Sequence, residues 1–153
     1  MKKLIAVSLL ALPTLAVAEN LVLSGTAAQA CTFSGTTTGA LTVSGTSITT
    51  ATPATTVVTN NDPNFYKVTV GTVAGLTSAP SGMSLTGNMV LSPSISSGAN
   101  SGATFTGTDA AGKEANLALA AADTVSISLS GTLNGPALAG AYSATSAVSC
   151  IAQ

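Results

Sequence analysis

Apolar and polar residues alternate along most of the chain, in runs that end at Gly, Pro, Asn or Asp. A period of two is typical of β-strands with one buried face, because successive side chains of a strand point to opposite sides. The clearest run covers 123–130, where Val125, Ile127 and Leu129 alternate with Ser and Thr. We expect the apolar residues of this run to face a core and the hydroxyl residues to face water.

The same alternation predicts further strands on both sides of this run. They cover 21–27, 32–34, 41–44, 55–59, 65–73, 83–86, 89–91, 103–107 and a final strand from 140 to 150. Segment 116–120 is ambiguous, because its Ala and Leu residues favour a helix while its alternation favours a strand. The Ser/Gly/Asn-rich segment 93–102 predicts a mobile loop, and 109–114 predicts a polar turn.

Short strands with turn signals about ten residues apart, and no long helical pattern, predict an all-β fold with an antiparallel sandwich or barrel. A repeat architecture is the alternative, because Ser-Gly-Thr recurs at 24–26, 34–36, 44–46 and 130–132. The regular spacing fails after Thr46, whereas a stacked array needs about three similar units. The sandwich is therefore the favoured interpretation.

Residues 1–18 have the three parts of a secretory signal peptide: two lysines near the start, an apolar run over 4–12, and a small-x-small cleavage site at 16–18. The apolar run is shorter than the ~20 residues that span a bilayer, which argues against a membrane anchor. We expect export with cleavage before Glu19 and no membrane insertion afterwards. The mature chain of 135 residues suits one domain.

The chain contains two cysteines, Cys31 and Cys150. Cysteines of an exported protein most often pair, so we predict a disulfide between them, with free thiols or an intermolecular bridge as the alternatives. The bridge would close a loop of nearly the whole mature domain and stabilise it by about 4–5 kcal/mol. It places a domain at 31–153, preceded by an N-terminal segment at 19–30.

The composition is rich in Ser, Thr, Gly and Ala, which by itself could indicate disorder. Disordered chains, however, combine low hydrophobicity with high net charge. Here 46% of the residues are hydrophobic and only 6% are charged. We therefore expect a folded β protein whose outer surface carries hydroxyl groups in place of charges, a surface with little repulsion against packing into a fibre.

Few charges remain after cleavage of the signal. Two lysines, Lys67 and Lys113, stand against five acidic side chains, giving a net side-chain charge of −3. Nucleic acids and anionic membranes are therefore unfavourable partners, because both require a basic surface.

The residues for enzymatic chemistry are also scarce, since the chain lacks His and Arg. The acids Asp62, Asp109, Glu114 and Asp123 all stand beside turn residues, where a solvated loop position is the simpler interpretation, with Lys113 and Glu114 at a solvated tip. No nucleophile motif such as Gly-x-Ser-x-Gly or Ser-x-x-Lys is present. We predict that the protein is not an enzyme.

Metal and cofactor sites are not indicated either. Asp62 with Asn60, Asn61 and Asn64 could offer oxygen atoms to calcium, but the spacing and the number of acids fall short of a calcium loop. The favoured interpretation is a turn, because Asn and Asp tolerate left-handed conformations and Pro63 fixes φ. We expect no cofactor.

One aromatic residue near the end of the chain has two structural interpretations. Tyr142 can be a corner tyrosine of a sandwich or an ordinary half-buried strand residue.

Several stretches together resemble a known family of exported proteins. They are the signal peptide, the alternating strand 20–26, Ala30-Cys31-Thr32-Phe33, the segments 58–62 and 66–70, and Leu-Ala-Gly-Ala-Tyr-Ser at 138–143, similar to a Pro-Gly-x-Tyr lead into a last strand. The pattern resembles the pilus (fimbrial) subunits assembled by the chaperone–usher route, especially the archaic and colonisation-factor-like branches. The similarity covers most of the mature chain through loose motifs.

The resemblance implies an immunoglobulin-like antiparallel β-sandwich that lacks its final strand and is completed by donor-strand exchange. The N-terminal segment of the next subunit fills the groove by strand addition. The inserted side chains would be those of Leu21, Leu23, Gly25 and Ala27. The implied partners are other copies of the chain, a periplasmic chaperone and an outer-membrane usher, and the implied location is a cell-surface fibre.

The position of the second cysteine departs from the family pattern, which places it in the first third of the chain. A bridge from Cys31 to Cys150 would constrain the strands that flank the groove, because the Cα atoms must lie within ~7 Å. Either the bridge lies beyond the end of the groove, or the domain is complete and needs no donor. The second possibility predicts a self-contained, disulfide-closed β-sandwich that acts as an adhesin or as a periplasmic or surface binding module.

Overall fold

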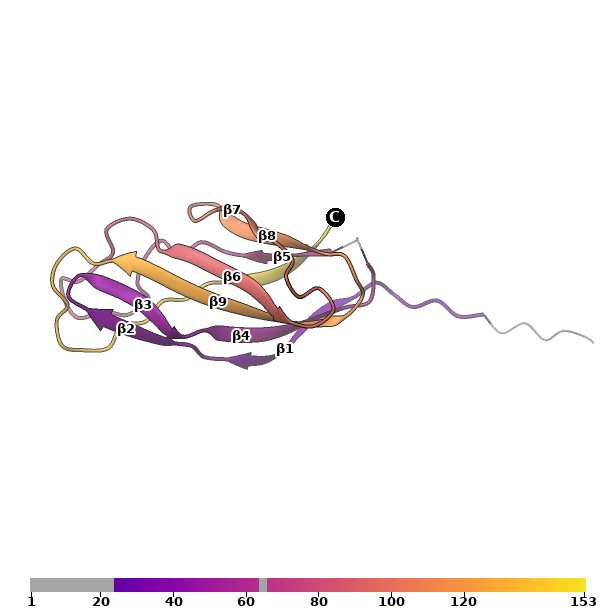
Figure 1. Cartoon of the computed structure of the whole chain (residues 1–153), viewed down its shortest axis with the longest axis horizontal. Coiled ribbons are helices and arrows are strands. Elements are labelled where there is room, and N and C mark those ends of the chain that lie inside the picture. The colour runs from indigo at the N-terminus through magenta and orange to yellow at the C-terminus, as the bar shows by residue number, and fades with distance from the viewer. Residues whose placement is uncertain (1–23, 64–65) are drawn as a thin grey trace, which may run out of the picture.

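A computed structural model describes residues 24–63 and 66–153, so the predicted signal peptide and the donor residues Leu21 and Leu23 lie outside the described residues. The described part contains ten strands and no helix, and the strands form two antiparallel sheets (Figure 1). This arrangement confirms the predicted all-β sandwich class.

The larger sheet contains six strands. They are β1 (Cys31–Thr37), β2 (Ala40–Ser44), β3 (Ser47–Thr52), β4 (Ala54–Asn60), β6 (Val90–Ser97) and β9 (Ala122–Thr132). β4 and β3 pair with the same side of β9, β6 pairs with its other side, and β1 and β2 form the outer edge next to β4 and β3. A bend at Gly39 and Pro53 separates the paired halves, and a Cβ atom at Gly39 would lie 2.6 Å from the backbone of Thr52 and Ala54.

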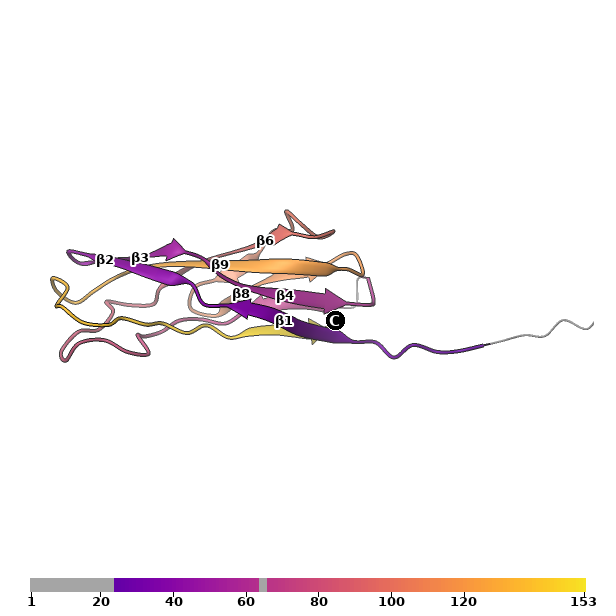
Figure 2. The same ribbon diagram turned by 90° about the horizontal axis from the view of Figure 1, so that it is seen from below.

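The smaller sheet contains four strands in the order β10 (Val148–Ala152), β5 (Tyr66–Val70), β8 (Gly112–Leu117) and β7 (Thr106–Thr108). The view in Figure 2 shows that the C-terminus and the N-terminal segment lie at the same end of the long axis. The molecule is therefore elongated along its strands, with β10 and β1 forming edges of different sheets on the same side.

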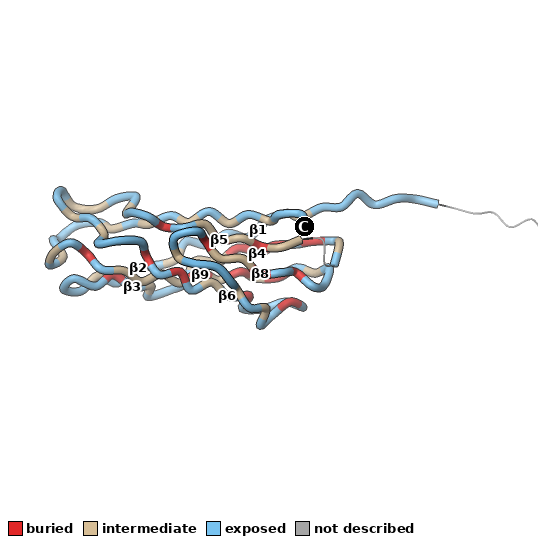
Figure 3. Tube along the Cα trace, turned by 90° about the horizontal axis from the view of Figure 1, so that it is seen from above, coloured by how far each residue is buried: buried red, intermediate tan, exposed pale blue. Residues whose placement is uncertain are grey.

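The core lies between the two sheets, where the buried stretches of Figure 3 are concentrated. The alternation predicted for β9 is confirmed, because Val125 and Ile127 are buried while the intervening Ser and Thr residues are more exposed. Val68 and Val70 of β5 are likewise buried, as predicted. The hydrophobic pattern thus orients these central strands correctly.

The outer face of the larger sheet carries mainly hydroxyl side chains. Across β9 and its neighbours, Ser126 lies opposite both Thr55 and Ser94, and Ser128 lies opposite Ser92. The only ionisable side chain in the six strands of this sheet is that of Asp123, which is fully buried on the inner face. The expected hydroxyl surface is confirmed for this face.

The prediction of a mobile loop over 93–102 is wrong for its first half. β6 continues through Pro93 to Ser97. Proline lacks an N–H group, and it is tolerated here because β6 pairs only with β9 and is an edge strand. The proline and serine residues led to the incorrect loop prediction. Their presence argues against a central strand but not against an edge strand.

Other predicted boundaries also differ from the structure. Segment 83–86 forms only an isolated bridge between Leu85 and Leu133, and the final strand begins at Val148. The first strand of the domain continues through Gly35, whose positive φ of 58° suits a break in the pairing register. These differences arise where the backbone is extended but the neighbouring strand with which it would pair is irregular or absent.

The ambiguous segment 116–120 is resolved as the end of a strand, since β8 extends to Leu117. The prediction of a solvated tip for Lys113 and Glu114 is wrong, because both residues lie within β8. Glu114 forms an ion pair of 2.7 Å with Lys67 on the neighbouring strand.

The predicted solvated turn position of Asp123 is also wrong. Its carboxyl group is fully buried and accepts hydrogen bonds from the backbone N–H (2.8 Å) and the side-chain amide (2.6 Å) of Asn100. The Asn100 amide also donates to the Leu119 carbonyl at 2.8 Å. Gly98 lies against this pair with a φ of 110°, and a Cβ atom there would collide with the carboxyl group. The polar pair therefore holds the loop after β6 against the start of β9.

A second polar contact, on the same side of the molecule, connects the larger sheet to the smaller one. The Leu91 backbone N–H donates to Asp109 Oδ1 at 2.7 Å, and Lys113 Nζ lies 3.1 Å from the same oxygen. Lys113 also donates to the Leu91 carbonyl. The pKa of the Asp109 carboxyl lies below its ordinary value. The larger cause is the hydrogen bond from the Leu91 N–H, and the contact with Lys113 adds to it.

Replacing Asn100 should strongly destabilise the fold. Asn100→Ala would leave the buried Asp123 carboxyl without its side-chain donor, so we expect the free energy of unfolding to fall by about 3 kcal/mol or more. The measurement is urea denaturation followed by circular dichroism. Asn88→Ala, at an exposed position, is the matched control and should change the value by less than about 0.5 kcal/mol. Equal effects of the two variants would contradict the role of the pair.

Acidification should remove the contribution of Asp109. Because its pKa is lower in the folded state, the stabilisation is present above the ordinary value of 3.8 and is lost as the pH falls through the folded pKa. The difference in Tm between the wild type and Asp109→Asn should therefore be constant near neutral pH and should shrink below pH 3.8. Thermal unfolding across this range measures it, and a difference that does not change with pH would refute the assignment.

Candidate functional site

The two long sides of the sandwich differ in how well the core is covered. On one side, β6 covers the core, and its residues Leu91 and Ile95 are 0% and 3% exposed. On the other side, the edge formed by β1 and β2 faces β10 and the extended segment 141–147 that precedes it. Within the described residues no strand lies between these two edges. The second side is therefore the candidate functional site.

A groove follows these two edges. It consists of three adjoining cavities, of which the central one has a volume of about 350 Å³. Neighbouring cavities share Leu41 and Tyr142 at one junction and Ile127 and Ser146 at the other. Its apolar lining comes from both edges and from the floor: Phe33, Leu41, Val43, Ala54, Ile127, Leu129, Leu138, Tyr142, Ala144 and Val148.

The exposure of Phe33 shows that the core is incompletely covered here. Phe33 lies opposite Val58 in the pairing of β1 with β4, so it belongs to the same inner face. Val58 is 0% exposed, whereas Phe33 is 42% exposed. Leu41 and Val43 of β2 also pack against the core and remain only partly buried. An apolar row on the inner face of the sheet is thus open to solvent.

The backbone at the groove has hydrogen-bonding groups that face outward. Gly71 N–H donates to the Ala147 carbonyl at 2.7 Å, and Thr77 N–H donates to the Ser143 carbonyl at 2.8 Å. In an antiparallel pair the groups of alternate residues point to opposite sides. The N–H and C=O groups of Val148, which lies next to Ala147 in β10, therefore point away from β5 and toward the groove, and this edge can accept a further strand.

The disulfide closes one end of the groove. Cys31 and Cys150 form the predicted bridge with a Cα–Cα distance of 6.2 Å. A strand placed between two others requires about 9.6 Å, twice the spacing of ~4.8 Å between neighbouring strands. No strand fits between the edges at the level of the bridge, and the groove begins beyond it, at Phe33 and Val148. The bridge therefore lies at one end of the groove.

The N-terminal segment leaves the domain at this closed end. Residues 24–30 are exposed, belong to no strand, and extend along the long axis away from the sandwich (Figures 1 and 3). Among the predicted donor residues, Gly25 and Ala27 lie in this exposed segment, while Leu21 and Leu23 lie outside the described residues. None of the described donor residues pairs within its own domain.

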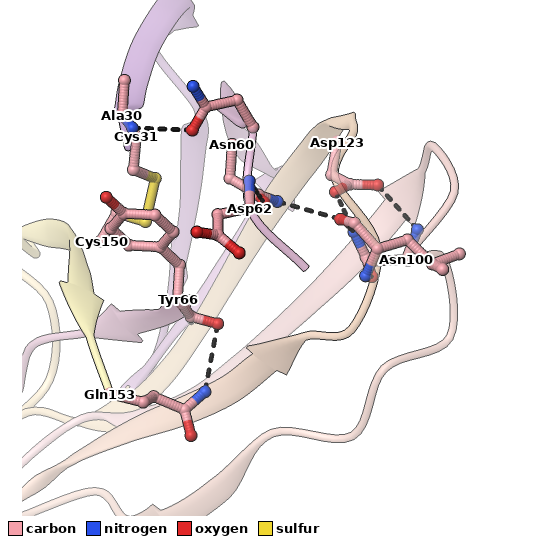
Figure 4. Close-up of a disulfide and its surroundings, with 11 residues drawn as sticks. Ala30, Cys31, Asn60, Asp62, Tyr66, Asn100, Asp123, Cys150 and Gln153 are labelled. Carbon is pink, nitrogen blue, oxygen red and sulfur yellow. Dashed lines mark hydrogen bonds between the residues drawn. A yellow bond between two sulfur atoms is a disulfide. The ribbon is translucent and has the colours of Figure 1, made fainter. Parts of the chain in front are cut away.

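Asn61 holds the base of this segment. Its side-chain oxygen accepts from the Ala30 N–H at 2.7 Å, a contact drawn beside the disulfide in Figure 4. Its side-chain amide donates to the Ala28 carbonyl at 2.8 Å, and its backbone N–H donates to the Ala30 carbonyl at 3.2 Å. We name these three hydrogen bonds the Asn61 clamp. The clamp keeps residues 28–30 in line with β1.

The calcium candidates serve other contacts in the structure. The Asn60 amide donates to the Leu119 carbonyl, the Asn61 side chain forms the clamp, and Asp62 accepts from Gln29. Asn64 lies outside the described residues. Over 24–63 and 66–153 no three His, Cys, Asp or Glu side chains gather as metal ligands would.

Tyr142 is a corner tyrosine, as one of its two interpretations predicted. Its hydroxyl group donates to the Leu138 carbonyl and accepts from the Leu138 N–H, both at 3.0 Å. This pattern is shared with immunoglobulin-like sandwiches, where such a tyrosine bonds the backbone a few residues upstream. It fixes the loop at the end of the groove that lies far from the disulfide.

The sequence analysis did not predict the positions that two residues take at the candidate site. The inward direction of Phe33 could have been predicted from its position two residues after Cys31, because residues two apart share one face of a strand. The role of Asn61 had no local signal, since its partners Ala28 and Ala30 lie more than thirty positions earlier. In the described ranges no helix is long and apolar enough to cross a membrane.

Removing the bridge should destabilise the domain. Cys31→Ser with Cys150→Ser opens a loop with a sequence separation of 119. We expect the free energy of unfolding to fall by about 4–5 kcal/mol, because the unfolded chain gains entropy. Urea denaturation of the oxidised wild type and the double variant measures the change, and identical midpoints would show that the bridge does not stabilise the fold.

Comparisons of the chain with models of protein families, with curated proteins and with solved structures find no match.

Proposed function

We propose that the protein is a structural, pilin-like subunit of an extracellular fibre or surface appendage that polymerises by adding its N-terminal strand to the next copy. The single observation that carries the proposal is the open apolar groove between β1/β2 and β10, together with an N-terminal segment that extends away from its own domain. An unpaired sheet edge over an exposed core is a template for strand addition.

The sequence of the N-terminal segment suits this groove. Leu21, Leu23, Gly25 and Ala27 alternate, so in a strand they project from one face. Burial of each Leu against the open apolar row would contribute about 1.5–3 kcal/mol. The small Gly25 permits close approach of the two backbones.

The geometry also favours a linear fibre. The groove is lined by residues of β1, β2 and β10. These strands run along the long axis, and the N-terminal segment leaves at one end of that axis (Figures 1 and 2). A contact between two different surfaces of identical subunits continues indefinitely when the rotation does not close a ring. Head-to-tail insertion would therefore produce a filament of single subunits.

The remaining features agree with an exported fibre. A disulfide is typical of oxidising compartments, and the outer face of the larger sheet bears hydroxyl groups without charges that would repel neighbours. The resemblance to pilus subunits adds a periplasmic chaperone and an outer-membrane usher as proposed partners, and a cell-surface location reached through the periplasm.

A second candidate function is a self-contained adhesin or binding module. The observation that favours it is the disulfide, which joins the two edges of the groove within one chain. In that case the groove would hold a ligand in place of a strand, and the purified protein would be a stable monomer.

A change in the donor strand should abolish polymers. Leu23→Asp, or deletion of 19–29, should leave monomers, because a buried carboxylate without a partner opposes insertion. Val22→Asp is the matched control, since Val22 lies on the opposite face of the strand and should retain polymerisation. The measurement is electrophoresis of unheated samples, in which strand-linked polymers give a ladder that collapses on heating. A wild type without a ladder, or a ladder unchanged in Leu23→Asp, would refute the proposal.

A further inference from the structure

We propose that the disulfide and the Asn61 clamp together prevent the N-terminal segment from filling the groove of its own domain, and so direct it to a second copy of the chain. This inference rests on the proposed function. A donor strand could in principle insert into the groove of its own domain or into that of a second copy. Its own groove would normally be favoured, because a tethered segment has a high effective concentration near its own domain and would outcompete a separate molecule.

The bridge blocks the direct path into the groove. The segment leaves the domain at Cys31, and the groove starts beyond Cys31 and Cys150, at Phe33 and Val148. The Cα–Cα distance of 6.2 Å is smaller than the ~9.6 Å that an intervening strand needs. A segment returning to its own groove must therefore pass outside the bridge.

The Asn61 clamp prevents an early reversal of the chain. A strand that turned back at residues 28–30 would start closest to the groove. Those residues are instead held in line with β1 by the hydrogen bonds of Asn61 to Ala28 and Ala30. Reversal has to begin before Ala28 or to break the clamp.

The remaining length is then too short for the groove. The mature chain has nine residues before Ala28, 19–27, whereas the inner edge from Phe33 to Val43 spans eleven. A reversal consumes at least about two residues, and the detour around the bridge consumes more. The apolar positions Leu41 and Val43 at the far end would stay uncovered. A segment from a second copy needs no reversal and no detour around the bridge, because it can enter from the far end, where Leu41 and Val43 lie.

The test measures whether a dilute full-length monomer keeps an open groove. A labelled peptide of residues 19–29 is added at nanomolar concentration to the wild type, refolded with its disulfide intact, and to the full-length variant Leu21→Asp/Leu23→Asp, whose own segment cannot insert. We expect equal dissociation constants within about twofold by fluorescence anisotropy. Binding to the wild type that is about 10²-fold weaker would mean that the chain fills its own groove, and would overturn the inference.

Two further variants test separately the Asn61 clamp and the length of the N-terminal segment. Asn61→Ala should bind the peptide several-fold more weakly than the wild type, because its own segment can now compete, while the control Asn88→Ala should bind unchanged. Insertion of about ten Gly and Ser residues between Ala27 and Ala28 should weaken peptide binding further. Unchanged binding in Asn61→Ala would refute the role of the clamp. Unchanged binding in the insertion variant would refute the role of the short segment. Absence of peptide binding in every protein would instead refute strand addition itself, and the inference with it.

Discussion

The rest of the structure depends on the single covalent link between the first residue of β1 and the middle of β10. Cys31 and Cys150 join the edges of two different sheets on the side where no described strand closes the sandwich. Elsewhere the sheets are held by a core of mostly small aliphatic side chains and by one polar link, in which Asp109 and Lys113 at the β7–β8 hairpin bond the backbone of Leu91 in β6. This link lies along the side that β6 covers. The disulfide is thus the covalent connection between the sheets on the opposite, open side.

The charged side chains of the described residues take part in contacts within the fold. Lys67 pairs with Glu114, Lys113 pairs with Asp109, and the Asp123 carboxyl is sealed inside by Asn100. Partly exposed ion pairs contribute little to stability one by one. Their value here is positional: the pair of Lys67 and Glu114 joins two neighbouring strands of the smaller sheet, and the pair of Lys113 and Asp109 lies at the β7–β8 hairpin that contacts Leu91 of the larger sheet. An exposed surface built mostly from Ser, Thr and Gly then remains available for contact between molecules.

Much of the fold could be predicted from alternation, because β5 and β9 are central strands whose innermost residues are apolar and whose outer residues are polar. The prediction failed where tertiary context overrides local pattern. Pro93 is accepted in β6 because only one side of that strand is paired, and Asp123 is buried because Asn100 reaches it across the loop. The disulfide was also predictable from the sequence. The groove itself was not, since it depends on which edges β1 and β10 occupy, and neither the bend at Gly39 nor the reach of Asn61 has a local sequence signal.

The hydroxyl face of the larger sheet gives the molecule a surface whose charge does not depend on pH. Ser and Thr side chains do not titrate in water, and the one carboxyl group in those six strands points inward. Neither acid nor added salt can therefore change the electrostatic potential arising from this face, as they do for a surface covered by Lys and Glu. Its hydration should be the same in fresh water, in brine and in an acidic niche, so that contacts made through it would survive changes of environment that dissociate charged interfaces.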